Sequence, residues 1–181
     1  VFNPKAANAD KYASYGALVA HELTRAIDAK GSLVDAKGEL RSWWTPADKT
    51  AWTLLGSRVA AQYNGYAFPG VKDAKVNGTL TQEENLADLA GVELAWAAYR
   101  SQEPQAQPAD QQGFFRAWAA LWPQQLSPNE AAARVASDIR APGKWRTNGP
   151  LANLPAFGAS FSCKPGQPMQ RTDAEQIKVW R

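Results

Sequence analysis

Apolar side chains recur at helical spacing between residues 12 and 29, and this amphipathic pattern predicts a helix. Gly31 is its expected end, because glycine commonly lies just past a helix. Asp-Ala-Lys-Gly then occurs twice, at 28–31 and 35–38, which predicts a tight turn or short hairpin rather than a metal loop. The apolar positions of the helix are Leu18, Val19, Leu23, Ala26 and Ile27.

Capping sequences predict two later helices. Thr45 is placed as an N-cap, with Pro46 at the first helical position and Asp48 near the positive end of the helix dipole. This start predicts a helix over 46–65. The letters SPNE form a capping box that predicts a second helix, over 127–139.

A third helix is predicted over 81–99. Thr81 and Glu84 fit a capping box at its start. A buried stripe follows at helical spacing. Its members are Leu86, Leu89, Ala90, Leu94 and Trp96.

The remaining segments are predicted to contain both loops and short helices. Residues 101–113 are polar and contain proline, which indicates a surface loop, and 114–122 return to a helical pattern. From Pro142 onward, glycine and proline predict mostly irregular chain with short helices, the last near 173–179. With little strand alternation and no GxGxxG, P-loop or GxSxG sequence, residues 1–181 are predicted to form a single, mainly α domain.

Composition narrows the function classes. The chain has 181 residues, of which 45% are hydrophobic, as expected for a globular protein. A net charge of +3 without a block of like charges gives no support for nucleic-acid or membrane-surface binding. No apolar run is long enough to span a bilayer. Cys163 is the single cysteine, so no disulfide forms within the chain and no Cys/His cluster of zinc spacing exists.

The letters HELTR at 21–25 come one residue short of His-Glu-x-x-His, the helical signature of zinc peptidases. His21 and Arg25 share one helix face, with Glu22 beside them as a candidate general base. Arg25 cannot be a metal ligand, because arginine stays protonated and has no lone pair to donate. His21 is the only histidine, so a His-His-Glu site is excluded and His21 with Glu84 is left as a two-ligand remnant.

Four segments resemble the carboxy-terminal catalytic part of the neprilysin family of zinc metallopeptidases (family M13), from about Phe2 to Trp180. The resemblance implies a mainly α, zincin-like (thermolysin/neprilysin-type) catalytic subdomain with long irregular segments and little sheet. It also implies that the family's amino-terminal lobe is absent from residues 1–181. The segments are FNPKA with YASYGALVAHELTRAID, GELRSWWTPAD, VNGTLTQEENLADLAGVELAWAAY and APGKWRTNGPLANLPAFGASFSCKPGQPM.

The resemblance also implies roles for individual residues. His21 matches the first zinc histidine and Glu22 the general base. Glu84 matches the third zinc ligand and Asp88 the carboxylate that orients the first histidine; their spacing puts both on one helix face. Without the resemblance, Glu84 would be a capping residue and Asp88 a solvated charge. Arg146 matches the arginine that grips substrate, whose planar fork suits a peptide carbonyl or carboxylate.

The chain departs from the family at its catalytic positions. Arg25 stands where the family has the second zinc histidine, and Arg140 where it has the histidine that stabilises the transition-state oxyanion. Glu83 replaces a glycine ahead of the ligand glutamate. These changes predict a degenerate member, a pseudopeptidase in which no cofactor is expected where the family binds zinc.

Arginine can replace the charge of zinc but not its chemistry. We expect Arg25 to fill the metal's volume in a bidentate pair with Glu84 or Glu22, since a buried unpaired carboxylate is costly. Arginine does not lower the pKa of a bound water as zinc does, so hydrolysis should be lost. Binding of a peptide or carboxylate at Arg140 and Arg146 remains open.

Three interpretations of function follow. The favoured one is a zinc-less pseudopeptidase retained for peptide binding or as a scaffold. The second is an active zinc metalloendopeptidase whose atypical site is completed by a partner chain, and the third is a purely structural subunit. We also expect a second polypeptide, either the amino-terminal lobe of the same precursor or a separately encoded subunit, to cover the Trp-rich helices. Because family members are commonly membrane-anchored or exported, the resemblance implies a periplasmic or extracellular setting.

The resemblance bears on cysteines as well. Arg58 and Ile177 occupy the places of two cysteines that pair in secreted animal members of the family. Cys163 matches a cysteine whose usual partner lies upstream of this chain, and is expected here to act as a small buried hydrophobe.

Overall fold

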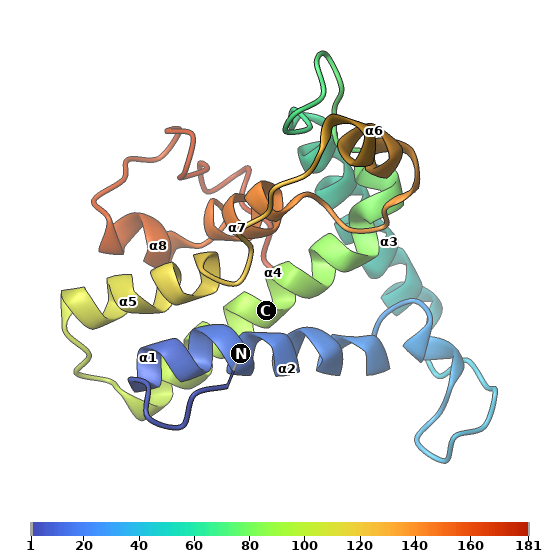
Figure 1. Cartoon of the computed structure of the whole chain (residues 1–181). Coiled ribbons are helices and arrows are strands. Elements are labelled where there is room, and N and C mark those ends of the chain that lie inside the picture. Colours follow the sequence, from blue (N-terminus) through green and yellow to red (C-terminus); the bar gives the residue numbers. More distant parts are fainter. Residues whose placement is uncertain (1, 181) are drawn as a thin grey trace.

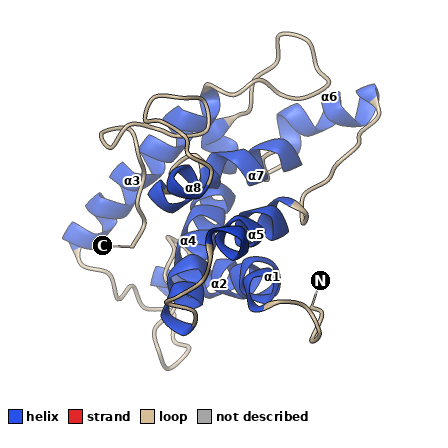
Figure 2. Cartoon of the chain, turned by 90° about the vertical axis from the view of Figure 1, so that its left-hand side faces the viewer, coloured by secondary structure: helices blue, strands red, loops and turns tan. Residues whose placement is uncertain are grey.

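Helices make up the regular structure of this chain. The computed structural model describes residues 2–180, and within them no strand forms beyond isolated antiparallel bridges such as Val34 with Leu40. The expected mainly α fold with little sheet is confirmed, and Figures 1 and 2 give two views of it. The helices are α1 (Asn8–Lys11), α2 (Ala17–Leu23), α3 (Pro46–Asn64), α4 (Gly78–Gln102), α5 (Pro108–Ala119), α6 (Pro128–Ser137), α7 (Gly143–Leu151) and α8 (Pro155–Ser160).

The helix predicted over 12–29 is α1 and α2 joined into one rod. A π-helical turn, Tyr12–Gly16, connects them, and a 3-10 turn, Thr24–Ala26, ends the rod. The rod therefore starts earlier than predicted, at Asn8, and ends earlier too. Gly31 opens another 3-10 turn instead of ending the helix. The following residues make the expected short turn, in which Val34 bridges Leu40.

α4 runs through the middle of the molecule, with α2 and α3 packed against it (Figure 1). It is buried on nearly every side, as expected for a helix that is apolar over much of its circumference. Leu86 and Leu89 join an apolar cluster with α3, whereas Val92 and Tyr99 join a second cluster with α1 and α5. Because both clusters share α4, this one helix sets where α2, α3 and α7 lie relative to each other.

The helix starts at Thr45 and Ser127 are confirmed. The Thr45 hydroxyl accepts the Asp48 amide at 3.2 Å, and the Asp48 carboxylate accepts the Thr45 amide at 2.8 Å. Ser127 and Glu130 make the same reciprocal pair at the start of α6. These boxes satisfy amides that would otherwise have no partner in the first helical turn.

The predicted start of the third helix at Thr81 is wrong. Asn77 is the N-cap of α4, and its side chain accepts the Leu80 amide at 3.0 Å. Thr81 lies inside the helix, where its hydroxyl donates to the Asn77 carbonyl at 2.9 Å. An asparagine side chain reaches the first-turn amides as well as threonine does, so Asn77 starts the helix four residues earlier than predicted. As a consequence Glu84 is not a capping residue and its side chain is free for another role.

The predicted loop over 101–113 is only partly correct. Residues 103–107 are irregular, but Pro108 occupies the first helical position of α5, where its missing amide costs nothing. The short helices expected after Pro142 are present as α7 and α8.

No helix forms near 173–179, contrary to the prediction. The amides of Glu175 and Gln176 donate to the Thr172 carbonyl in a single turn, and the amides that follow donate to side chains elsewhere in the chain. The Ile177 amide donates to Asn153 at 2.9 Å, and the Val179 amide donates to Glu93 at 3.0 Å. These contacts tie the end of the segment to Asn153 and to α4, so the turn at Thr172 does not continue into a helix.

Arg58 and Ile177 lie in adjoining segments. The Arg58 guanidinium donates to the Gln176 carbonyl at 2.9 Å and to the Ala174 carbonyl at 3.4 Å, while Ile177 is buried. Hydrogen bonds from α3 therefore hold the carboxy-terminal segment where the resemblance implied a disulfide in other members. Cys163 packs against the apolar cluster of α1 and α5. It is only half-buried, whereas a buried position was expected.

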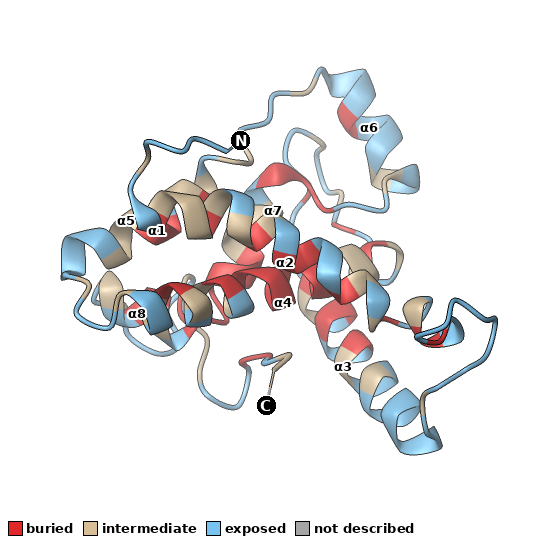
Figure 3. Cartoon of the chain, turned by 90° about the horizontal axis from the view of Figure 1, so that it is seen from below, coloured by how far each residue is buried: buried red, intermediate tan, exposed pale blue. Residues whose placement is uncertain are grey.

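Several of the exposed large apolar side chains lie in the first half of α3 and in the loop before it. The amino-terminal half of α3 and the loop before it are solvent-facing (Figure 3), with Leu40, Leu54 and Trp43 exposed by 90%, 62% and 45%. Leu23, at the end of α2, is exposed by 62%. Apolar surface of this kind typically marks an interface. Among the described residues, no helix has the length and apolar character needed to cross a membrane.

Candidate functional site

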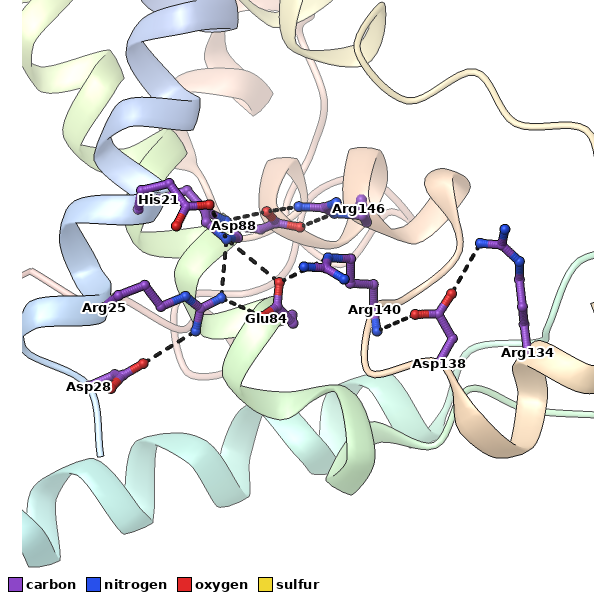
Figure 4. Close-up of polar contacts among 10 residues, drawn as sticks. His21, Arg25, Asp28, Glu84, Asp88, Arg134, Asp138, Arg140 and Arg146 are labelled. Carbon is purple, nitrogen blue, oxygen red and sulfur yellow. Dashed lines mark hydrogen bonds and ion pairs between the residues drawn. The ribbon is translucent and has the colours of Figure 1, made fainter. Parts of the chain in front are cut away.

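His21 and Asp88 form the buried centre of the site (Figure 4). His21 Nδ1 lies 2.8 Å from Asp88 Oδ1, and both residues are almost completely buried. A carboxylate at this distance favours the tautomer that carries its proton on Nδ1. The lone pair of His21 Nε2 then points away from Asp88, toward the end of α2.

Arg146, on α7, closes the far side of Asp88. Its Nε and Nη2 donate to the two carboxylate oxygens, each at 2.7 Å, in a bidentate pair. The guanidinium also lies 3.7 Å from the centre of the Trp122 ring. Burial disfavours the charged form of Arg146, but hydrogen bonding and attraction from Asp88 outweigh it, so the pKa of Arg146 is raised above its usual value. Arg146 is thus a fixed cation.

Arg25 extends from the end of α2 across the mouth of this centre. Its Nη2 donates to Glu84 Oε1 at 2.6 Å and lies 3.2 Å from His21 Nε2, which is placed to accept from it. Its Nη1 lies 3.3 Å from Asp28 Oδ2. The predicted contact between Arg25 and Glu84 therefore forms. It is not the expected bidentate pair, because the guanidinium divides its nitrogens between two carboxylates.

Glu84 is held by two arginines. Its Oε1 accepts from Arg25, and its Oε2 lies 3.4 Å from Arg140 Nε in an ion pair that lacks hydrogen-bond geometry. The Arg140 side chain is half exposed, whereas that of Glu84 is nearly buried. Glu22 points outward with 76% of its side chain exposed, and its Oε1 is 3.9 Å from His21 Nε2. The structure thus brings His21, Arg25, Glu84 and Arg140 together and leaves Glu22 at the rim.

These residues do not fit a zinc ion. Zinc needs three or four lone-pair donors converging on one point. Among residues 2–180, no group of three His, Cys, Asp or Glu side chains converges in this way. The space between His21 Nε2 and Glu84 Oε1 is bridged by Arg25 Nη2, a permanent hydrogen-bond donor with a positive charge. A cation placed there would meet both steric overlap and like-charge repulsion.

Gly91 allows α2 and α4 to approach closely enough to build the site. A Cβ at this position would lie 2.7 Å from the Ala17 carbonyl oxygen and 2.9 Å from the His21 amide nitrogen. Real Cβ atoms do not come that close to backbone, so any side chain here must push the helices apart. The position of His21 relative to Asp88 depends on this glycine.

Replacing Gly91 with alanine is expected to destabilise the fold by about 1–3 kcal/mol, because overpacking forces a backbone shift. Urea denaturation followed by far-ultraviolet circular dichroism measures the loss. Gly113→Ala is the matched control: it also lies inside a helix, yet nothing is within 4 Å of its added Cβ. That variant should be neutral or slightly stabilised, since alanine is the better helix former. Equal losses in the two variants would contradict the close approach.

Sequence reasoning missed three neighbours of the site. Asp28 follows Arg25 by three residues, a spacing at which side chains on a helical turn meet, so this contact was accessible from the sequence. Asp138 precedes Arg140 by two residues, and its carboxylate accepts the Arg140 amide, so this contact too is local. Trp122 lies under Arg146 but comes from a more distant part of the chain, and no local pattern signals that contact.

Comparison with known proteins identifies the family of this chain. The family model described as peptidase family M13 matches residues 1–177. Neprilysin-1 of Caenorhabditis elegans is 33% identical over 188 aligned residues, which cover 98% of this chain and 24% of that protein. The chain thus spans about a quarter of the length of the curated relatives it matches.

Solved structures show that the fold of this chain is similar to that of known proteins. PepO from Lactobacillus rhamnosis superposes with a TM-score of 0.89 at 36% identity, over 99% of this chain and 28% of that one. The zinc metalloprotease Zmp1 of Mycobacterium tuberculosis superposes with a TM-score of 0.92 at 28% identity, over 99% of this chain and 29% of that one. The expected zincin-like helical fold is confirmed. With residues 1–177 matched by the family model and 99% of the chain covered by these structures, the chain belongs to peptidase family M13, a family of metallopeptidases.

Proposed function

We propose that this chain is a catalytically degenerate M13 domain that binds peptide without a catalytic zinc ion. The position of Arg25 carries the proposal. Its Nη2 is 3.2 Å from His21 Nε2 and 2.6 Å from Glu84 Oε1, so a permanent cation bridges the two side chains that the resemblance makes metal ligands. Arg140 supplies a second positive charge to the other oxygen of Glu84.

The same arrangement argues against hydrolysis by the family's route. Peptide hydrolysis at a zinc site needs a metal that lowers the pKa of water and polarises the carbonyl. A guanidinium does neither, because it offers no empty coordination position. Glu22, the family's general base, is exposed at the rim and is idle in this proposal. Arg140 stands at the place of the oxyanion-stabilising histidine, so a second catalytic function is changed as well.

Peptide binding is supported by what remains around Asp88. Arg146 keeps its charge and its orientation through the bidentate pair with Asp88. No hydrogen bond within residues 2–180 engages its Nη1, which can donate to a peptide carbonyl or carboxylate. Asp88 in this proposal positions His21 and Arg146 rather than tuning a metal ligand.

The proposal includes a partner polypeptide. Residues 1–181 act as the carboxy-terminal, catalytic-type portion of a larger assembly, whose amino-terminal lobe comes from the same precursor or from a separate subunit. The exposed apolar side chains at Leu40, Leu54 and Trp43 support a partner on that side, as does the chain's match to only about a quarter of its relatives' length. The proposal extends to a periplasmic or extracellular setting, which rests on the resemblance to the neprilysin family.

Zinc analysis of the protein purified without chelator, together with any polypeptide that co-purifies, tests the proposal. The expected result is no stoichiometric zinc and no zinc-induced thermal shift. Zinc at one atom per chain, lost on His21→Ala, would overturn the proposal in favour of an active enzyme completed by its partner. Retention of a synthetic peptide pool in the presence of chelator, lost on Arg146→Gln, separates peptide binding from a purely structural role.

A further inference from the structure

A small cavity opens beside the site, between the loop after α5 and the segment that joins α6 to α7. Its volume is about 200 Å³, below the range typical of drug-sized ligands and enough for one small group. Trp122, Gln124, Asp138 and three arginines line it. The arginines are Arg134, Arg140 and Arg146.

The positive charge in this cavity exceeds the negative charge. Three arginines line it against one acidic residue, Asp138. Asp138 is already engaged, since it accepts from Arg134 Nη1 at 3.1 Å and from the Arg140 amide at 2.9 Å. Glu84 and Asp88 balance part of the charge of Arg140 and Arg146 from outside the cavity. What faces the cavity itself is therefore mainly hydrogen-bond donors.

Several of these donors have no partner within the described residues. Arg134 uses only Nη1, and Arg140 makes no side-chain hydrogen bond at all. Arg146 uses Nε and Nη2 on Asp88, which leaves its Nη1. Arginines from separate elements that line one small space suit a planar oxyanion, which accepts two hydrogen bonds at once.

We propose that this cavity binds a peptide carboxylate, with Arg134 and Arg140 as its principal donors. The proposal deepens the proposed function and rests on it, because it names the chemical group of the peptide that the cleft selects. A carboxylate fits the cavity better than a phosphate dianion, since the Asp138 carboxylate lies in the wall and the volume is small. Leu121, Trp122 and Pro123 offer an apolar wall for the carbon atoms next to the carboxylate.

Arg134 is the specificity-determining residue in this proposal. It lies on α6, away from the positions that the family resemblance assigns, and its contact to Asp138 is an exposed pair at i, i+4 spacing. Such a pair contributes little to stability, so Arg134 can be replaced without unfolding the chain. The carboxylate has two possible sources, the end of a peptide or an acidic side chain, and both present the same group.

Three small probes distinguish these sources by NMR titration of the purified chain with any co-purifying polypeptide. N-acetylglycine carries a terminal carboxylate, N-acetylaspartate amide carries one in a side chain, and N-acetylglycine amide carries none. The signals followed are the Trp122 indole and the backbone amides of Arg140 and Gly143. The expected result is saturable shifts with at least one carboxylate probe and none with the amide, and the better of the two probes identifies the source.

Arg134→Gln should weaken the better probe about tenfold, the loss expected for one hydrogen bond to a charged group. Arg116→Gln, which removes the same charge from the exposed face of α5, should leave the affinity unchanged. The proposal is overturned if the amide shifts the same signals, if the two variants weaken binding equally, or if inorganic phosphate binds more tightly than both carboxylates. A chain that holds zinc yet binds the carboxylate refutes only the proposed function, and a zinc-free chain that binds no carboxylate refutes only this inference.

Discussion

Replacing Arg25 with histidine is expected to create a zinc site in this chain. The new imidazole would lie one helical turn from His21 on the same face, and the guanidinium that bridges His21 and Glu84 would be gone. Asp88 already fixes the orientation of the His21 ring, so that the lone pair on Nε2 is available to a metal ion. The purified Arg25→His variant should therefore contain about one zinc per chain by elemental analysis, against none in the unsubstituted protein.

The same variant should become more stable with zinc. A ligand that binds only the folded state raises stability by about 2.7 kcal/mol when its free concentration is a hundredfold above the dissociation constant. Differential scanning calorimetry with and without zinc measures this shift. Arg25→Gln is the control, since it removes the same charge but adds no imidazole, and it should bind no zinc. A variant Arg25→His that stays zinc-free would mean that Glu84 or His21 is not poised as described.

Replacing Asp88 with asparagine should cause the largest loss of stability among single substitutions at the site. Asp88 is 1% exposed, and it balances the buried charge of Arg146 while accepting from His21. Asparagine keeps the volume but removes the negative charge, which leaves a buried guanidinium without its counterion. Removal of one partner of a buried pair costs about 3–5 kcal/mol. Urea denaturation followed by tryptophan fluorescence gives the difference.

Asp173→Asn is the matched control, because Asp173 is exposed and the same substitution there should change stability by less than about 0.5 kcal/mol. Adding Arg146→Met to Asp88→Asn should recover part of the loss, since it removes the uncompensated cation. If Asp88→Asn proves as mild as the control, the pair with Arg146 does not hold the site together.

The sequence predicted the start of a helix correctly where it contained a complete capping box with proline directly after the cap residue. Thr45 and Ser127 each stood before a proline with an acidic residue three positions on, and both caps formed. At the start of α4, Thr81 and Glu84 fit the capping-box pattern, yet Asn77 is the cap and Thr81 lies inside the helix. The helix predicted near 173–179 does not form because the amides of Ile177 and Val179 bond to side chains that are distant in the sequence.

The candidate site likewise has features that the sequence predicts and features that depend on the three-dimensional packing. The i, i+4 spacings of His21 with Arg25 and of Glu84 with Asp88 follow from helical geometry, so their shared faces were predictable. That the two faces meet depends on Gly91, which permits the close contact of α2 with α4. The pairing of Arg25 with Asp28, which prevents a bidentate contact with Glu84, follows from the 3-10 turn that ends the rod. The close contact at Gly91 has no local signal in the sequence, whereas the spacing of Arg25 and Asp28 is visible there.

The π-helical turn between α1 and α2 decides which side chains the rod presents to α4. Ala9, Ala13, Ala17 and His21 follow one another at intervals of four, and all are buried. On an unbroken α-helix, each such interval overshoots a full turn by about 40°, so this row would spiral away from its partner. The wider turn at Tyr12–Gly16 takes up part of that overshoot. The row of alanines therefore stays in register with His21, and a deletion within the turn would rotate the histidine out of the site while leaving every residue of the site unchanged.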